Sequence, residues 1–119
     1  MTKTIMIVDD SASVRLLASY SLREAGFSVI EAKNGLEALD TLRDERIDLL
    51  ITDMNMPDLD GLGLIKKVRE NDREIPILIL TTSTEKGKKL EGQASGASAW
   101  LSKPFTASQI REVASRLIV

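Results

Sequence analysis

Short runs of consecutive apolar residues constrain the fold of this chain more than any other feature of its sequence. The runs lack the alternation of polar and apolar residues that marks a half-buried strand. Continuously apolar runs instead predict strands that are buried on both faces, as in a parallel sheet that helices cover. The four clear runs are residues 5–8, 49–51, 77–80 and 99–101. A fifth, weaker strand candidate spans residues 28–32.

Between these runs the apolar residues recur with the period of a helix. The first predicted helix begins after Ser11, a candidate N-cap, and ends before Gly26. Its predicted core-facing residues are Val14, Leu17, Ala18, Leu22 and Ala25. Other helices are predicted around residues 38–42, 64–68 and 110–117. A helix over residues 85–95 is predicted to be soft, because Gly87 and Gly92 each cost up to about 1 kcal/mol relative to alanine.

The order of these elements is a strand followed by a helix, five times within 119 residues. This order predicts one α/β domain over residues 1–119, with a doubly wound parallel sheet of five strands and helices on both faces. In such sheets ligands bind at the carboxyl ends of the strands. The residues that follow each apolar run are therefore the candidates for function.

The composition limits the available chemistry. The chain has no cysteine and no histidine, which excludes disulfides, thiolate metal sites and the commonest general base. Its formal net charge of −2 argues against nucleic acid or an anionic membrane as a partner. The apolar runs are far shorter than the roughly 20 residues that span a bilayer, and the N-terminus lacks a signal peptide. We expect a soluble, cytoplasmic monomer.

Charged and hydroxyl residues follow the predicted strands. Asp9 and Asp10 come after the first strand, Asp53 ends the third, Thr81 ends the fourth and Lys103 follows the fifth. Carboxylates crowded at one sheet edge repel one another, so a cation is required. Hard oxygen ligands suit Mg²⁺, and a metal ion together with a lysine would attract a phosphoryl group. A carboxylate is then the remaining nucleophile, and Asp53 is the best placed to form an aspartyl phosphate.

Each of these residues also has an ordinary interpretation. Asp9 and Asp10 could cap the first helix, Lys103 could be a solvated loop lysine, and Thr81 could be a common strand residue. An acidic calcium loop after Asp53 fails because the glycine and glutamate of that pattern are missing, and a dinucleotide loop at Gly61 fails because its third glycine is missing. Only the combination of residues at the strand ends favours a phosphoryl site.

The motifs that carry a family resemblance are Asp9-Asp10, residues 53–57 followed by Asp60-Gly61, Thr81, and residues 103–105. Over its whole length the chain resembles the receiver domains of two-component response regulators, and among them the single-domain chemotaxis regulators. The resemblance implies a flavodoxin-like fold with strand order 2-1-3-4-5. It also implies that the chain is a phosphoacceptor, which assists its own phosphorylation and dephosphorylation, and not an enzyme acting on a separate substrate.

The same resemblance assigns roles to individual residues. A histidine kinase would phosphorylate Asp53. The Asp10 and Asp53 side chains and the Asn55 backbone carbonyl would bind Mg²⁺, while Asp9 would hold the water shell of the metal. Lys103 would contact the phosphoryl oxygens, and the peptide bond from Lys103 to Pro104 resembles one that is cis in the family.

Switching in the family couples Thr81 to an aromatic residue that is Trp100 here, where tyrosine or phenylalanine is usual. We expect phosphorylation to shift a two-state equilibrium of residues 82–96. By analogy, the output face lies on the fourth helix, fifth strand and fifth helix and meets an acidic, apolar partner segment. The candidate contact residues are Lys86, Lys88, Lys89, Trp100 and Arg111. The alternative is that the lysine run is only a solvated helix face.

Three functional classes follow. The first is a signalling receiver that a chemotaxis-type histidine kinase phosphorylates and that controls motility through a motor-switch or other downstream protein. The second is a phosphate sink or shuttle, or a phosphorylation-independent interaction module, that does not act on a motor. The third is an FMN-binding or hydrolytic protein. Asp9 and Asp10 argue against FMN because they would repel its phosphate, and Asn55 stands where a phosphatase needs a second acid.

Overall fold

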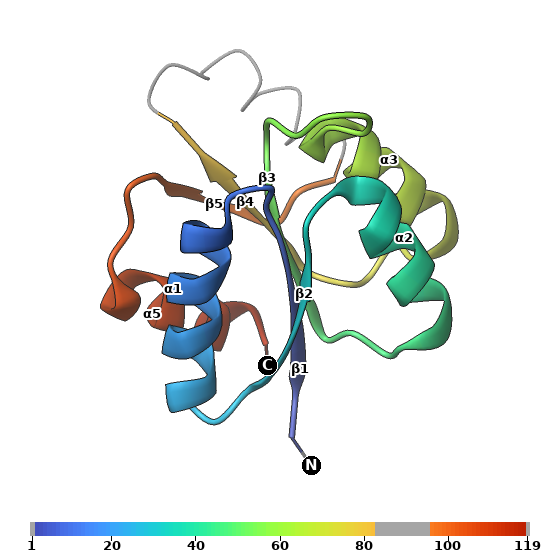
Figure 1. The fold of residues 1–119 in the computed structure, drawn as a ribbon. Coiled ribbons are helices and arrows are strands. Elements are labelled where there is room, and N and C mark those ends of the chain that lie inside the picture. The colour runs from blue at the N-terminus through green and yellow to red at the C-terminus, as the bar shows by residue number, and fades with distance from the viewer. Residues whose placement is uncertain (1, 83–95, 119) are drawn as a thin grey trace.

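The computed structural model describes residues 2–82 and 96–118, and its centre is one parallel sheet (Figure 1). The strand order is β2-β1-β3-β4-β5, so the predicted flavodoxin-like α/β architecture is confirmed. All the apolar runs, including the weak candidate, form strands. The strands are β1 (Thr4–Val8), β2 (Ser28–Ala32), β3 (Leu49–Asp53), β4 (Ile77–Thr81) and β5 (Ala99–Ser102).

Helices cover both faces of the sheet (Figure 1). The described helices are α1 (Ala12–Glu24), α2 (Gly35–Asp44), α3 (Gly61–Asn71) and α5 (Ala107–Leu117). The helix predicted over residues 85–95, with Gly87 and Gly92, lies outside the described residues. In the two described ranges, no helix is long and apolar enough to cross a membrane.

Successive residues of the central strands feed two separate cores. In β1, Ile5 and Ile7 pack with α1 and α5, whereas Met6 and Val8 pack with α2 and α3. All four side chains are fully buried. A strand that is buried on both faces has no place for a polar side chain, which explains why its sequence is continuously apolar.

Polar residues set the helix ends at the edge of the sheet where β1 and β3 end. The Ser11 hydroxyl accepts a hydrogen bond from the Val14 amide at 3.4 Å and caps α1, as predicted. Asp60 caps α3 by accepting from the Gly63 amide at 2.7 Å. At the opposite end of α1, Gly26 has a φ of +95°, which is a conformation that favours glycine.

The buried side of α1 differs from the predicted one. Ala18 and Leu22 are fully buried, but Leu17 is 42% exposed and Ala25 is exposed, so those two positions were predicted wrongly. Ser21 is buried in the same helix. Its hydroxyl donates to the Leu17 carbonyl at 2.7 Å, and this bond satisfies the polar atom inside the core.

An arginine joins α3 to the loop that precedes β5. The Arg69 guanidinium donates to the Gly96 carbonyl from Nε at 3.1 Å and from Nη2 at 2.7 Å. Gly96 has a φ of +109°, and a Cβ atom there would lie 2.9 Å from Arg69 Nε. The positive φ therefore favours glycine at position 96, and the Arg69 side chain would have to shift to admit a Cβ atom there.

Candidate functional site

The carboxyl ends of β1, β3 and β5 bring two acids and a lysine into contact. Lys103 Nζ lies 2.9 Å from Asp9 Oδ2 and 2.9 Å from Asp53 Oδ1. The backbone of Lys103 is held in place because its amide donates to the Thr81 carbonyl at 2.7 Å. The Lys103 side chain is 20% exposed, so the interpretation as a solvated loop lysine is wrong.

The surroundings of Asp9 fix it on several sides. Its backbone amide donates to the Ala32 carbonyl at 3.2 Å, and its Oδ1 accepts from the Ser11 amide at 2.9 Å. Ser11 supplies the N-cap of α1, so neither aspartate is the capping residue. Asp9 is fully buried, and the one polar contact of its Oδ2 among the described residues is the ion pair with Lys103. A buried carboxylate oxygen with this geometry has capacity for a further cation.

Asp53 ends β3 and is 7% exposed. Burial raises the pKa of its carboxyl above the usual value, and the negative charge of Asp9 adds to the rise, while the Lys103 hydrogen bond opposes it. For Lys103, burial alone would lower the pKa, but the contacts with Asp53 and Asp9 outweigh it and raise the pKa overall. The lysine is therefore charged at neutral pH, and it faces two acids.

Asp10 completes a group of three carboxylates. One oxygen from each of Asp9, Asp10 and Asp53 lies within 4.8 Å of the others. One lysine cannot neutralise three carboxylates, and all the candidate ligands are hard oxygens of the kind that Mg²⁺ prefers. The buried Oδ2 of Asp9 is one of the atoms that such an ion would satisfy. The residues therefore fit a magnesium ion, which would draw the oxygens of a phosphoryl group toward Asp53.

The remaining predicted residues lie on β4, on β5 and in the loops that follow β3 and β5. Thr81 is buried at the end of β4, and its hydroxyl donates to the Thr82 carbonyl at 3.2 Å. Trp100 is half-buried on β5 and packs on the core beneath α2 and α3. Asn55 is exposed after β3, and the peptide bond from Lys103 to Pro104 is cis.

The predicted partner face is only partly visible. Lys86, Lys88 and Lys89 lie outside the described residues. Arg111 is half-buried on α5, whose core lies on the opposite face of the sheet from the core that contacts Trp100. The structure therefore does not bring Trp100 and Arg111 onto one core.

One residue near the acid cluster, Arg15, was missed in the sequence, and a second, Gly61, was named only as part of a motif. Arg15 donates from Nη1 to the Asp9 carbonyl at 2.6 Å, and Gly61 donates its amide to the Met54 carbonyl at 2.9 Å. Arg15 could have been noticed, because a cation near the start of a helix opposes the helix dipole and needs another reason. Gly61 belongs to a motif noted in the sequence, but the motif alone does not show what its missing side chain makes room for.

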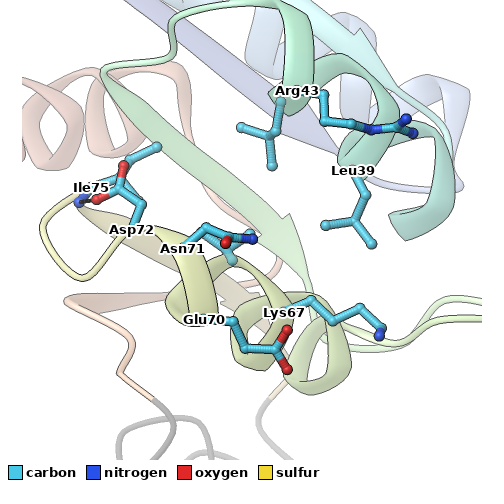
Figure 2. Close-up of a pocket in the computed structure, with 9 residues that line it drawn as sticks. Leu39, Arg43, Lys67, Glu70, Asn71, Asp72 and Ile75 are labelled. Carbon is cyan, nitrogen blue, oxygen red and sulfur yellow. Dashed lines mark hydrogen bonds between the residues drawn. The ribbon is translucent and has the colours of Figure 1, made fainter.

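A cavity among the described residues is lined by none of the residues of the acid cluster. It is a groove of about 430 Å³ between α2 and α3, with apolar side chains along it and charged ones at its rim (Figure 2). Its lining residues are Leu39, Leu42, Arg43, Lys67, Val68, Glu70, Asn71, Asp72 and Ile75. The groove contains none of the predicted site residues.

Asp53→Asn is expected to raise the free energy of unfolding at pH 7 by about 1 kcal/mol. A raised pKa means that the folded state binds a proton more tightly than the unfolded state does. The stability of the unaltered chain therefore falls as pH rises from the usual aspartate range through the raised pKa. The Asp53→Asn variant has no carboxyl group at this position, so its stability does not fall with pH for this reason. Urea denaturation between pH 3 and 8 checks the difference, with the exposed Asp44→Asn as control, and equal curves for both variants would contradict it.

The chain was compared with known protein families, proteins and solved structures. The family model "Response regulator receiver domain" matches residues 5–115. The chain is 38% identical over 110 residues to the alkaline phosphatase synthesis transcriptional regulatory protein PhoP of Bacillus subtilis. That match covers 92% of this chain but 46% of PhoP, so the chain spans about half the length of that relative.

Two further matches cover nearly the whole of both proteins. The sporulation initiation phosphotransferase F of Bacillus subtilis is 33% identical over 118 residues, which are 99% of this chain and 95% of that protein. The solved structure of the chemotaxis response regulator CheY4 of Vibrio cholerae has a TM-score of 0.93 at 39% identity and covers 98% of this chain and 99% of its own. The fold, the acidic edge and these matches agree, and the chain belongs to the receiver-domain family of two-component response regulators.

Proposed function

We propose that this chain accepts a phosphoryl group on Asp53 from the phosphohistidine of a histidine kinase. The observation that carries the proposal is the position of Lys103 Nζ, 2.9 Å from both Asp53 Oδ1 and Asp9 Oδ2. A carboxylate oxygen of Asp53 attacks phosphorus and forms a P–O bond. The P–N bond to the kinase histidine breaks, and its electron pair leaves with the imidazole.

The other residues of the cluster supply positive charge and position. Asp9, Asp10 and Asp53, with the Asn55 backbone carbonyl, would hold Mg²⁺, and the ion would neutralise charge on the phosphoryl oxygens. Lys103 is aimed at Asp53 and would transfer its ammonium contact to a phosphoryl oxygen. Thr81, at the end of the neighbouring strand, would turn its hydroxyl toward the same group.

For the output, we propose that the phosphorylated chain changes its contacts with a downstream protein and controls chemotaxis or motility. The close likeness to CheY4, which extends over almost all of both chains, supports this proposal. The likeness to phosphotransferase F, which also extends over nearly the whole chain, supports the alternative that the chain passes a phosphoryl group on without acting on a motor. We place Trp100 at the output face in either case, because it is half-buried on the edge strand β5.

The test is intact-mass spectrometry after incubation with Mg²⁺ and acetyl phosphate, a small phosphoryl donor. We expect one phosphoryl adduct on the unaltered chain and on Asp44→Asn, and none on Asp53→Asn. EDTA added before the donor is expected to prevent the adduct, because three carboxylates and one lysine leave the site too negative for a phosphoryl group.

Two results would contradict the proposal. One is an adduct that persists in Asp53→Asn, and the other is the absence of any adduct from acetyl phosphate and from a phosphorylated histidine kinase. The phosphorylated chain also separates the two outputs: binding to a flagellar motor-switch protein supports motility control, and transfer to a histidine phosphotransfer protein without motor binding supports the shuttle.

A further inference from the structure

Arg15 extends from the first turn of α1 back to the loop that carries the acids. Its Nη1 donates to the backbone carbonyl of Asp9 at 2.6 Å. The start of a helix carries a partial positive charge, so an arginine there is electrostatically unfavourable and needs a compensating contact. The Asp9 carbonyl provides that contact. The Arg15 side chain is 18% exposed, so it lies largely within the structure.

An acid on β2 holds the arginine in this position. Arg15 Nε lies 3.5 Å from Glu31 Oε1. Arg23, two turns further along α1, approaches the other oxygen of Glu31 at 3.8 Å and is 54% exposed. Arg23 also donates to the Val29 carbonyl at 3.3 Å, and none of its contacts within residues 2–82 and 96–118 joins it to the acid cluster. Both arginines therefore pair with Glu31, but only Arg15 also contacts Asp9.

The carbonyl that Arg15 holds belongs to the peptide group between Asp9 and Asp10. The orientation of this peptide group sets the direction in which the next residue leaves the backbone. Asp10 is exposed, and no hydrogen bond or ion pair restrains its side chain among the residues that the structure describes. Its carboxylate nevertheless lies within 4.8 Å of those of Asp9 and Asp53. Because no described side-chain contact holds it there, the direction of the backbone at Asp10 determines whether its carboxylate reaches the other two, against the repulsion of two like charges.

We propose that Arg15 is a positioning residue of the metal site, and that it holds the peptide group between Asp9 and Asp10 so that Asp10 stays beside Asp53. The inference rests on the proposed magnesium site but not on phosphorylation. Contacts outside the ligand shell that orient metal ligands commonly change metal affinity by about 10- to 100-fold when they are removed. Arg15 is such a contact, and it acts through the backbone.

The test is the dissociation constant for Mg²⁺, measured by isothermal titration calorimetry on the whole chain without any phosphoryl donor. We expect Arg15→Gln to weaken Mg²⁺ binding by about tenfold. The matched control is Arg23→Gln, which removes a positive charge from the same helix and a partner from the same acid, Glu31. We expect its dissociation constant for Mg²⁺ to stay within about twofold of that of the unaltered chain. Asp10→Asn provides the reference for loss of a ligand.

The direction of the change separates positioning from simple electrostatics. Removal of a positive charge near a cation site lowers repulsion and would tighten Mg²⁺ binding. Positioning predicts the opposite. Arg15→Lys keeps the charge but loses the planar fork that reaches both Asp9 and Glu31, so we expect it also to weaken binding. It serves as the test variant if Arg15→Gln does not fold, as judged by its thermal unfolding.

Equal or tighter Mg²⁺ binding by the folded Arg15 variants would overturn the inference, as would a chain that binds no Mg²⁺ at millimolar concentration. Weaker binding that Arg23→Gln reproduces would also overturn it, because the effect would then belong to the Glu31 pair. If Mg²⁺ binds as expected but acetyl phosphate gives no adduct, the phosphoacceptor proposal fails and the role of Arg15 stands.

Discussion

Replacing Lys103 with methionine is expected to lower the free energy of unfolding at pH 7 by about 2–3 kcal/mol. The substitution leaves Asp9, which is fully buried, and Asp53, which is 7% exposed, without the ammonium group that lies 2.9 Å from both. Removing one partner of a buried ion pair costs more than the pair contributes, because the remaining charge stays desolvated. The expected loss is moderate because the lysine side chain is 20% exposed, and water screens part of the interaction.

The loss is expected to depend on pH with a definite sign. Burial and Asp9 already raise the pKa of Asp53, and without Lys103 nothing opposes that rise except the backbone hydrogen bond of Met54. An acid whose pKa is raised in the folded state stabilises the fold as it takes up a proton, so the variant regains stability as pH falls from 7 through the raised pKa. Added Mg²⁺ is expected to restore stability at pH 7, because it binds the folded state.

Urea denaturation across pH 4–8, with and without Mg²⁺, measures both effects. Lys66→Met is the control, because Lys66 is an exposed lysine on α3 without an ion pair among the described residues. A Lys103→Met chain as stable as the control at pH 7, or a loss that does not shrink at lower pH, would contradict the electrostatic account.

Gly61→Ala is the second substitution for which we expect a large effect. A Cβ atom at this first residue of α3 would lie 2.3 Å from the Asp53 carbonyl oxygen and 2.9 Å from Met54 Cα. Both are backbone atoms, and moving the helix away would break the hydrogen bond from the Gly61 amide to the Met54 carbonyl. We expect a loss of about 3 kcal/mol in the free energy of unfolding. Phosphorylation of Asp53 is expected to slow about tenfold, because its backbone must shift.

The chain provides a matched control two residues further along the same helix. A Cβ atom at Gly63 would lie 2.7 Å from Leu59 Cδ1, which is the end of a side chain that can rotate away. Alanine is also a better helix former than glycine. We therefore expect Gly63→Ala to change stability by less than about 1 kcal/mol. The two variants are compared by urea denaturation and by the rate of adduct formation, and equal losses would show that backbone contact with Asp53 is not the cause.

The sheet could be predicted well from the sequence because its signal is local. A strand buried on both faces is apolar at nearly every position, so β1 and β4 are recognisable in the sequence as runs of apolar residues. The weaker run at residues 28–32 also forms a strand, β2. Because parallel strands end at one edge of the sheet, the order of the strands and the residues that follow them predicts that Asp9, Asp53 and Lys103 meet. This part of the site follows from chain order alone.

Other features depend on distances that no period encodes. Leu17 fits the helical repeat of α1, yet it is exposed, because the burial of a helix position depends on how far the neighbouring elements extend. Arg15 meets Glu31 across two elements, and the space that Gly61 leaves for Asp53 depends on the angle at which α3 begins. The groove between α2 and α3 likewise arises from the separation of two helices.

Helix α3 is fastened at both ends to other parts of the chain. At its first residue the Gly61 amide donates to the Met54 carbonyl next to Asp53, and near its last turn Arg69 donates to the Gly96 carbonyl ahead of β5. In mechanical terms it is a stiff rod of about 16 Å that is pinned at two points. A displacement of the Gly96 carbonyl would therefore also pull on α3 and, through Gly61, on the residue that follows Asp53.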